Sequence, residues 1–515
     1  MNELAAIIIH VYPMATIVLL LLVLLTPLLK RLPEHEWEQI NHGYFYIIAA
    51  ISAAQTVLCS VWLLRYGIRG DSVYTGSVAQ TEYAYILLDS FSVFAVLLVS
   101  VAVLVSTIFS GALRLHGNVP RVTSILLAAI SSCATFLVVS IHVYFSLIMW
   151  ILLVILVLGA GYVLYAKNII AIAISSIASV FLLALGIIIF VSLGQILNGS
   201  LDLQSLWVYA LNSSVLKVAV PVTIFAIILL LIGGFAPALA SYLNKKNEEN
   251  IALKMPIILT SVTAATLVFM KISAFLHPPI IPSAEPNISP FLLPTCNLLT
   301  IFAHIMIILI IAVNLPIFLR GMNNPITRAI EEVKLALYPA LVPLTFSAIY
   351  LLVLVACLSA LSQGKEAATS TIIGVCLYLT VFPITLAISV YAPQMCKYFV
   401  GSRFAGVLKA VYTALFFYPV TAGLVMVVKL KDALLQANIF TPLIWLFIVL
   451  AFFGIAFNLY HIFLDKDEES ADKTGVNWAV IGYILGGIFL VLMLFAPLIF
   501  SNILTKIALS LFSSI

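Results

Sequence analysis

The chain has 515 residues, of which 64% are hydrophobic and only 9% are charged. A soluble domain carries roughly 25% charged residues, so this composition excludes a soluble enzyme or binding module and indicates an integral membrane protein. The formal net charge of +4 is too small to indicate a nucleic-acid or acidic partner.

Apolar runs of about 20 residues recur along the chain, and each is long enough to cross a bilayer of roughly 30 Å. They predict an all-α fold of about fourteen membrane-spanning helices. The first run is expected to be a retained span, because no basic residue precedes it and no small-residue cleavage site follows it. The expected spans are 5–29, 43–65, 84–110, 121–141, 143–166, 168–197, 215–240, 254–276, 296–319, 336–361, 368–395, 403–428, 440–464 and 476–500.

The segments between the spans indicate an orientation. Most of the 24 Lys and Arg residues follow odd-numbered spans, as Lys30, Arg114 and Lys245 do. The positive-inside rule then places these connections in the cytoplasm and both termini outside, in a cell inner (plasma) membrane. The apolar tail Ile503–Ile515 is too short to cross and is expected at the membrane interface.

Motifs for cofactors and catalysis are missing from the sequence. The six cysteines are scattered and form neither a CxxC pair nor a metal-ligand cluster with histidine. No GxGxxG or Walker motif and no catalytic constellation is present. We therefore expect no cofactor, no metal and no active site of the chain's own.

One stretch of the twelfth span is unusual for an apolar helix. In "YPVTAG", Tyr418–Gly423, a proline and a glycine interrupt the run, and Lys429 follows closely. The stretch resembles the helix-breaking "PPTAGF" signature of antiporter-like subunits in respiratory complex I and in multisubunit cation/proton antiporters. Leu87–Gly111 resembles that family's third span, with Asp-Ser-Phe-Ser where the family opens on Asp-Gly-Phe-Ser. Tyr165–Leu206 resembles its sixth span and the Gly-Ser-Leu-Asp-Leu ending of the following loop.

The resemblance implies an architecture and a set of partners. It implies two inverted five-helix repeats with breaks in helices 7 and 12, at Pro237, Pro419 and Gly423. The expected divisions are an N-terminal three-helix segment 1–120, a first repeat 121–276, a second repeat with its preceding loop 277–464, and a C-terminal helix and tail 465–515. The implied partners are other membrane subunits of the same complex and the lipid bilayer.

The family moves protons through charged side chains buried near mid-membrane, where a fifth-span carboxylate pairs with a seventh-span lysine. Burial lowers the pKa of a lysine towards neutral, so that it exchanges a proton. Here Ile151 follows Trp150 where the family has Glu, and no lysine stands near Phe235–Pro237. Lys217, at the outer edge of the seventh span, is expected to snorkel to the interface.

Two histidines are further candidates, each with a structural alternative. His142 begins the fifth span and would titrate near pH ~6.5, but an interfacial histidine at a helix end is favoured. His304, inside the ninth span, is interpreted as a packing histidine or as a proton relay.

Two lysines remain as pathway candidates. Lys271, in the eighth span, either faces a hydrated pathway or snorkels outwards. Lys429 is the strongest candidate, because the preceding helix break frees backbone groups that hold water. Lys431 is expected at the solvated helix end, and the carboxylates Glu82 and Asp89 are interpreted as solvated or capping groups.

The sequence thus predicts a membrane subunit of a multisubunit proton/cation-translocating complex, either a cation/proton antiporter or an NADH-quinone oxidoreductase-like assembly. The missing fifth-span and seventh-span charges favour the antiporter type. Two alternatives stay open: a degenerate structural subunit without ion flux, and an independent secondary solute transporter. Under each of these hypotheses the chain has no active site of its own, and at most it is a proton-translocating subunit of an NADH-quinone oxidoreductase.

Overall fold

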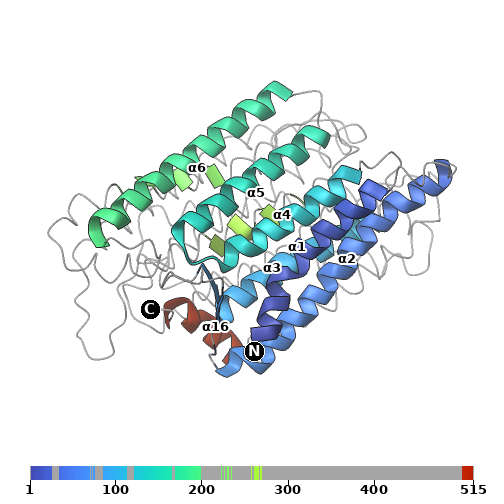
Figure 1. Cartoon of the computed structure of the whole chain (residues 1–515). Coiled ribbons are helices and arrows are strands. Elements are labelled where there is room, and N and C mark those ends of the chain that lie inside the picture. Colours follow the sequence, from blue (N-terminus) through green and yellow to red (C-terminus); the bar gives the residue numbers. More distant parts are fainter. Residues whose placement is uncertain are drawn as a thin grey trace, which may run out of the picture. The chain divides into compact units, whose positions relative to one another are not determined.

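The computed structural model describes residues 2–25, 34–69, 71, 73–75, 85–112, 121–164, 169–198 and 501–513, with single positions of 222–234 and 257–268 (Figure 1). Three helices in this part are long and apolar enough to cross a membrane, over Glu3–Leu25, Gly43–Arg69 and Ser90–Ile108. The chain is therefore a multi-pass membrane protein.

The described elements are mainly long helices. In chain order they are α1 (Asn2–Leu25), α2 (Glu34–Arg65), the short 3-10 turn η2 (Gly67–Arg69), β1 (Val73–Thr75), β2 (Ile86–Leu88), α3 (Ser90–Ala112), α4 (Arg121–Val139), α5 (Val143–Leu164), α6 (Ile169–Asn198) and α16 (Ser501–Ser513). Helices α1 to α6 coincide with the expected spans between 5–29 and 168–197, which confirms those predictions. The expected spans from 296 to 500 lie outside the described residues.

The start of the third span differs from the prediction. The sequence predicted a helix from residue 84, but Ile86–Leu88 forms strand β2, which pairs antiparallel with β1. The helix begins only at Ser90, because the Asp89 carboxylate accepts the Ser92 N–H at 2.7 Å and so caps the first turn. Asp89 is buried, which confirms its interpretation as a capping group rather than a solvated one.

Polar side chains join α1 to its neighbours near the middle of the helices. The Gln55 side chain of α2 donates to the Ile8 carbonyl at 2.7 Å, and the Tyr12 hydroxyl donates to Ser52 at 2.9 Å. Because the α2 partner numbers fall as the α1 numbers rise, α1 and α2 run antiparallel. Figure 1 shows α1, α4, α5 and α6 side by side in that order, in agreement with the contacts between them.

The C-terminal helix α16 packs at the end of the bundle where η2 lies. The Ser510 hydroxyl accepts the Phe91 N–H, at the start of α3, over 2.9 Å. The antiparallel pairing of α1 with α2 brings the Asn2 end of α1 to the same end of the bundle. Both described ends of the chain therefore lie together, as the expectation of two termini on one side requires; that this side faces outwards remains a prediction.

The chain divides into two compact units. Met1–Gly111, Leu115–Thr295 and Phe500–Ile515 form the first, and Ala112–Arg114 with Cys296–Ile499 form the second. Every described residue except Ala112 belongs to the first unit. The inverted repeats and their expected boundaries remain predictions.

Candidate functional site

Most of the predicted site residues lie outside the described part of the chain. The structure describes His142 and residues on either side of the expected fifth-to-seventh-span pair. It does not describe Lys217, Lys271, His304, Lys429, Pro237, Pro419 or Gly423.

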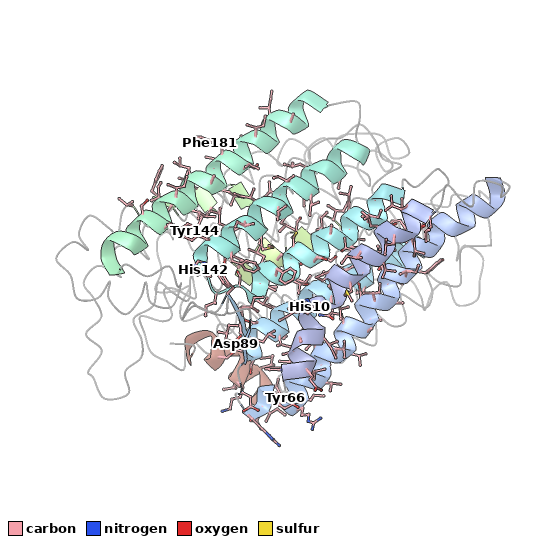
Figure 2. All side chains as sticks on the ribbon, in the orientation of Figure 1. His10, Tyr66, Asp89, His142, Tyr144 and Phe181 are labelled. Carbon is pink, nitrogen blue, oxygen red and sulfur yellow. The ribbon has the colours of Figure 1, made fainter. Side chains whose placement is uncertain are left out.

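His142 lies at the junction of α4 and α5, next to the β-hairpin (Figure 2). Its carbonyl accepts the Ser146 N–H at 2.9 Å, which begins the first turn of α5. Its ring lies 5.0 Å from the ring of Tyr85 and 5.8 Å from that of Tyr144, and its side chain is buried. The expected helix-end position is confirmed, but aromatic rings enclose the imidazole.

The hairpin fixes this junction from the other side. Ile86 pairs with Ser140 in a single antiparallel bridge, and the Ile141 N–H donates to the Tyr85 carbonyl at 3.0 Å. Backbone hydrogen bonds therefore hold Tyr85 against the residue that precedes His142. These backbone bonds and the neighbouring aromatic rings fix the position of the histidine.

Helix α5 turns one apolar face towards the protein and another away from it. Trp150, Leu153, Val154 and Val157 are buried, whereas Ile155 on the opposite face is half exposed. The buried positions recur at three- and four-residue spacing, as one face of an α-helix requires. No residue of α5 carries an ionisable acid or base of the Asp, Glu, Lys or Arg type.

The buried face of α5 meets the segment of the seventh span. Gly234 lies so close to the Trp150 ring that an added Cβ would stand 2.5 Å from Cζ2 of the indole. The neighbouring Gly233 lies equally close to α6, since its added Cβ would stand 2.8 Å from the Leu183 nitrogen. A side chain larger than hydrogen therefore requires a shift of the Trp150 ring at residue 234 and a shift against the α6 backbone at residue 233.

The same segment runs along α6 over two turns. An added Cβ on Gly186 of α6 would stand 3.0 Å from the Ala226 carbonyl, and one on Gly233 would stand 2.9 Å from the Ser179 carbonyl. Early residues of the segment thus meet late residues of this part of α6, so the two run antiparallel. Small residues permit such close backbone approach between membrane helices.

The structure thus brings together the two places at which the resemblance implies a charged pair. Trp150, which precedes the expected carboxylate position Ile151, lies directly on Gly234, which precedes the expected lysine region Phe235–Pro237. The geometry of a fifth-to-seventh-span contact is present, but an indole ring and a glycine pair occupy it. Sequence analysis missed Gly233–Gly234; the signal was a glycine pair inside an apolar run.

The described positions of the eighth span are buried and carry several hydroxyl groups. Thr260, Ser261 and Thr263 are all enclosed, and Thr263 Oγ1 has no hydrogen-bond partner within the described part of the chain. These residues precede Lys271 on the same span. Among the described residues, no three His, Cys, Asp or Glu side chains lie together where they could hold a metal ion.

Comparison with known proteins shows likeness only at the level of structure. No protein-family model and no curated protein sequence matches the chain. It is similar to a chain of the membrane-bound sulfane sulfur reductase, an archaeal respiratory membrane complex, with 14% identity and a TM-score of 0.67 over 99% of this chain and 98% of the other.

Two further structures show the same likeness. A chain of the Mrp complex from Dietzia sp. DQ12-45-1b matches with 11% identity and a TM-score of 0.61, over 99% of this chain and 98% of that one. A chain of respiratory complex I from Thermus thermophilus with bound NADH matches with 12% identity and a TM-score of 0.64, over 98% of both chains. The protein therefore shares one fold with chains of all three membrane complexes along nearly its whole length.

Proposed function

We propose that the chain is a membrane subunit of a multisubunit proton- or cation-translocating complex and a diverged member of the antiporter-like subunit family. The observation that carries the proposal is the shared fold, which covers 98% of the matched chain in each of three different membrane complexes. The "YPVTAG" stretch supports it independently, because it is a sequence feature and not a property of the fold. The partners would be the other membrane subunits of the same complex.

Translocation by this chain would use the charged groups that the spans retain. Lys429, after the helix break at Pro419 and Gly423, is the leading candidate, with Lys271 next. His304, Lys217 and His142 are secondary candidates. A charge within a membrane span is costly, so its presence favours a function for it.

The absence of the charged pair between the fifth and seventh spans bears on the type of complex. The resemblance to complex I subunits rests on landmarks that include the fifth-span Glu and the seventh-span Lys, and neither stands in this sequence. We therefore favour membership in a cation/proton antiporter over an NADH-quinone oxidoreductase.

A structural subunit without ion flux is the second candidate, and one observation favours it. Trp150 lies on Gly234 at the contact where the resemblance implies a conducting pair. An independent solute transporter is the third candidate; the broken helices that it would need are shared with the antiporter-like family and do not separate the two.

Substitution of the lysines distinguishes ion transport by the chain from a purely structural role. Membrane vesicles from cells that carry the wild-type chain, or Lys429→Ala, Lys271→Ala or Lys431→Ala, would be compared for cation-driven pH change with a fluorescent pH probe. Transport by the chain predicts that Lys429→Ala abolishes the signal and that Lys431→Ala, two residues further along the chain, preserves it. A scaffold predicts that all three variants transport normally, whereas removal of the whole chain abolishes transport together with assembly.

A further inference from the structure

The contact between α5, α6 and the 222–234 segment has an unusual combination of features. Trp150 is 2% exposed, Leu183 and Ala226 are fully enclosed, and Leu230 is 2% exposed. Leu183, Ala226 and Leu230 are apolar, and the indole N–H of Trp150 is the one polar group among these four side chains. A water file needs polar partners and room for each molecule, and a contact of this tightness offers too few partners and no room.

The backbone spacing closes the remaining room. Gly186, Gly233 and Gly234 each lie so near the facing helix that even a methyl group would press on its atoms, at 3.0, 2.8 and 2.5 Å respectively. The contact on α6 extends from Ser179 to Gly186, about 10 Å along the helix axis at 1.5 Å per residue. The tight contact is therefore about a third as long as a bilayer of roughly 30 Å is thick.

The atoms nearest to Gly234 show which side chain fills the contact. At Gly234 the three nearest atoms to an added Cβ all belong to the Trp150 indole: Cζ2 at 2.5 Å, Cε2 at 3.0 Å and Nε1 at 3.1 Å. The ring edge thus occupies the space that the glycine leaves. Removal of the indole would leave a void bounded by Gly234 on one side and by α5 on the other.

We propose that this contact is a proton-tight seal, and that Trp150 is the residue that closes it. The Trp150 seal, defined by Trp150, Leu183, Ala226, Leu230, Gly233 and Gly234, separates the two membrane faces between α5, α6 and the seventh-span segment. Any ion that the chain carries crosses the membrane elsewhere. The proposal concerns one contact inside the chain and holds whichever complex hosts the subunit.

The first test measures water access in a nearly unchanged protein. In a full-length chain whose six native cysteines are replaced by alanine, Ala226→Cys places a small thiol in the seal, and Asn502→Cys on the exposed side of α16 is the reference. A membrane-impermeant, charged thiosulfonate would be applied to each face of oriented vesicles. Because the reagent needs a hydrated thiolate, the seal predicts that Ala226→Cys is labelled from either face about tenfold or more slower than the reference is labelled from its own face. Labelling at the rate of the reference would overturn the proposal.

The second test opens the seal. Trp150→Gly removes the indole, Trp150→Phe keeps an aromatic filler, and Ile155→Gly makes the same change to glycine on the exposed face of the same helix. Passive proton entry would be followed in vesicles that hold equal amounts of folded chain, under a potassium diffusion potential with valinomycin. The seal predicts a several-fold faster leak for Trp150→Gly and wild-type rates for the other two. Equal rates for Trp150→Gly and Ile155→Gly would contradict it, and if Trp150→Gly does not fold, the thiol test alone decides.

Discussion

At the scale of single residues, polar groups inside the first unit stabilise it through specific acceptors and donors. Asp89 caps α3, Gln55 reaches the Ile8 carbonyl, and Tyr12 donates to Ser52. The Tyr12 side chain also lies near Ser100 of α3, so this phenol stands where three helices meet. In a lipid environment such groups have few alternative partners, so their loss has a measurable consequence.

The first prediction concerns the cap. Asp89→Ala removes the acceptor of the Ser92 N–H and should lower the free energy of unfolding by about 1 kcal/mol. Denaturant unfolding of the purified chain in detergent micelles would measure it. Asp89→Asn keeps an acceptor oxygen and is the control, expected near wild type; equal stability of Asp89→Ala and wild type would show that the carboxylate does not cap the helix.

The second prediction concerns the hydrogen bond between α1 and α2. A double-mutant cycle with Tyr12→Phe and Ser52→Ala should give a coupling free energy of about 0.6 kcal/mol, the typical value between membrane helices. The cycle cancels the other contacts of the Tyr12 hydroxyl, because both proteins that carry Tyr12→Phe lack them equally. Strict additivity of the two substitutions in unfolding measurements would mean that the bond contributes nothing.

At the scale of elements, the sequence was most informative where a long apolar run stands alone. Runs of that kind predicted α1 to α6 because a membrane-spanning helix must satisfy its own backbone hydrogen bonds over the whole thickness of the bilayer. Strand β2 was missed because Ile86–Leu88 is as apolar as the body of α3, and the prediction counted the Asp89-Ser90 step between them as part of the span rather than as its start. Only the pairing with β1 and the Asp89 cap separate the two elements, and pairing is a tertiary property.

The candidate site shows the same limit more sharply. The absence of a carboxylate after Trp150 and of a lysine near Phe235 could be seen in the sequence. That the indole itself lies on Gly234 could not, because the two residues belong to different helices and only their packing brings them together. His142 was correctly placed at a helix end, but the Tyr85 ring against it comes from the hairpin.

The third prediction belongs to this contact between elements. Gly234→Ala would press a methyl group on the Trp150 ring and should destabilise the chain by about 1–3 kcal/mol, as overpacking does. Gly159→Ala in α5 is the matched control, because nothing lies within 4 Å of its added Cβ. That control should be neutral or slightly stabilising, since alanine favours helix.

The smaller ring of phenylalanine gives the third prediction its counter-test. Gly234→Ala combined with Trp150→Phe should be less destabilising than the sum of the two single changes, because the smaller ring relieves the clash. Thermal unfolding of the four proteins in one detergent would compare them. Additive effects would show that residue 234 does not press on the ring.

At the scale of the whole molecule, the C-terminal helix returns to the start of the chain. Leu504 and Ile507 of α16 are buried, Asn502 and Lys506 are exposed, and Ser510 accepts the Phe91 N–H. The expected position of the tail at the membrane interface stays a prediction; the structure shows that Ser510 of the tail holds the first turn of α3. The first unit thus contains residues from both ends of the sequence.

The fourth prediction tests that closure. Ser510→Ala leaves the Phe91 N–H without this acceptor and should lower the free energy of unfolding by about 1 kcal/mol. Lys506→Ala, on the exposed side of the same helix, should leave stability unchanged. The same loss for both variants would indicate that α16 contributes through its helical propensity and not through the contact with α3.

The central claim is that the chain acts as one subunit of a larger membrane complex, and partner identification tests it most directly. The tagged full-length chain would be purified from its native membrane in a gentle detergent, and the co-purifying proteins identified by mass spectrometry. We expect a stable assembly with further membrane subunits of a cation/proton antiporter; quinone-reducing subunits would instead place the chain in a respiratory complex. A chain that purifies alone, stable and monodisperse, would contradict the claim and favour an independent transporter.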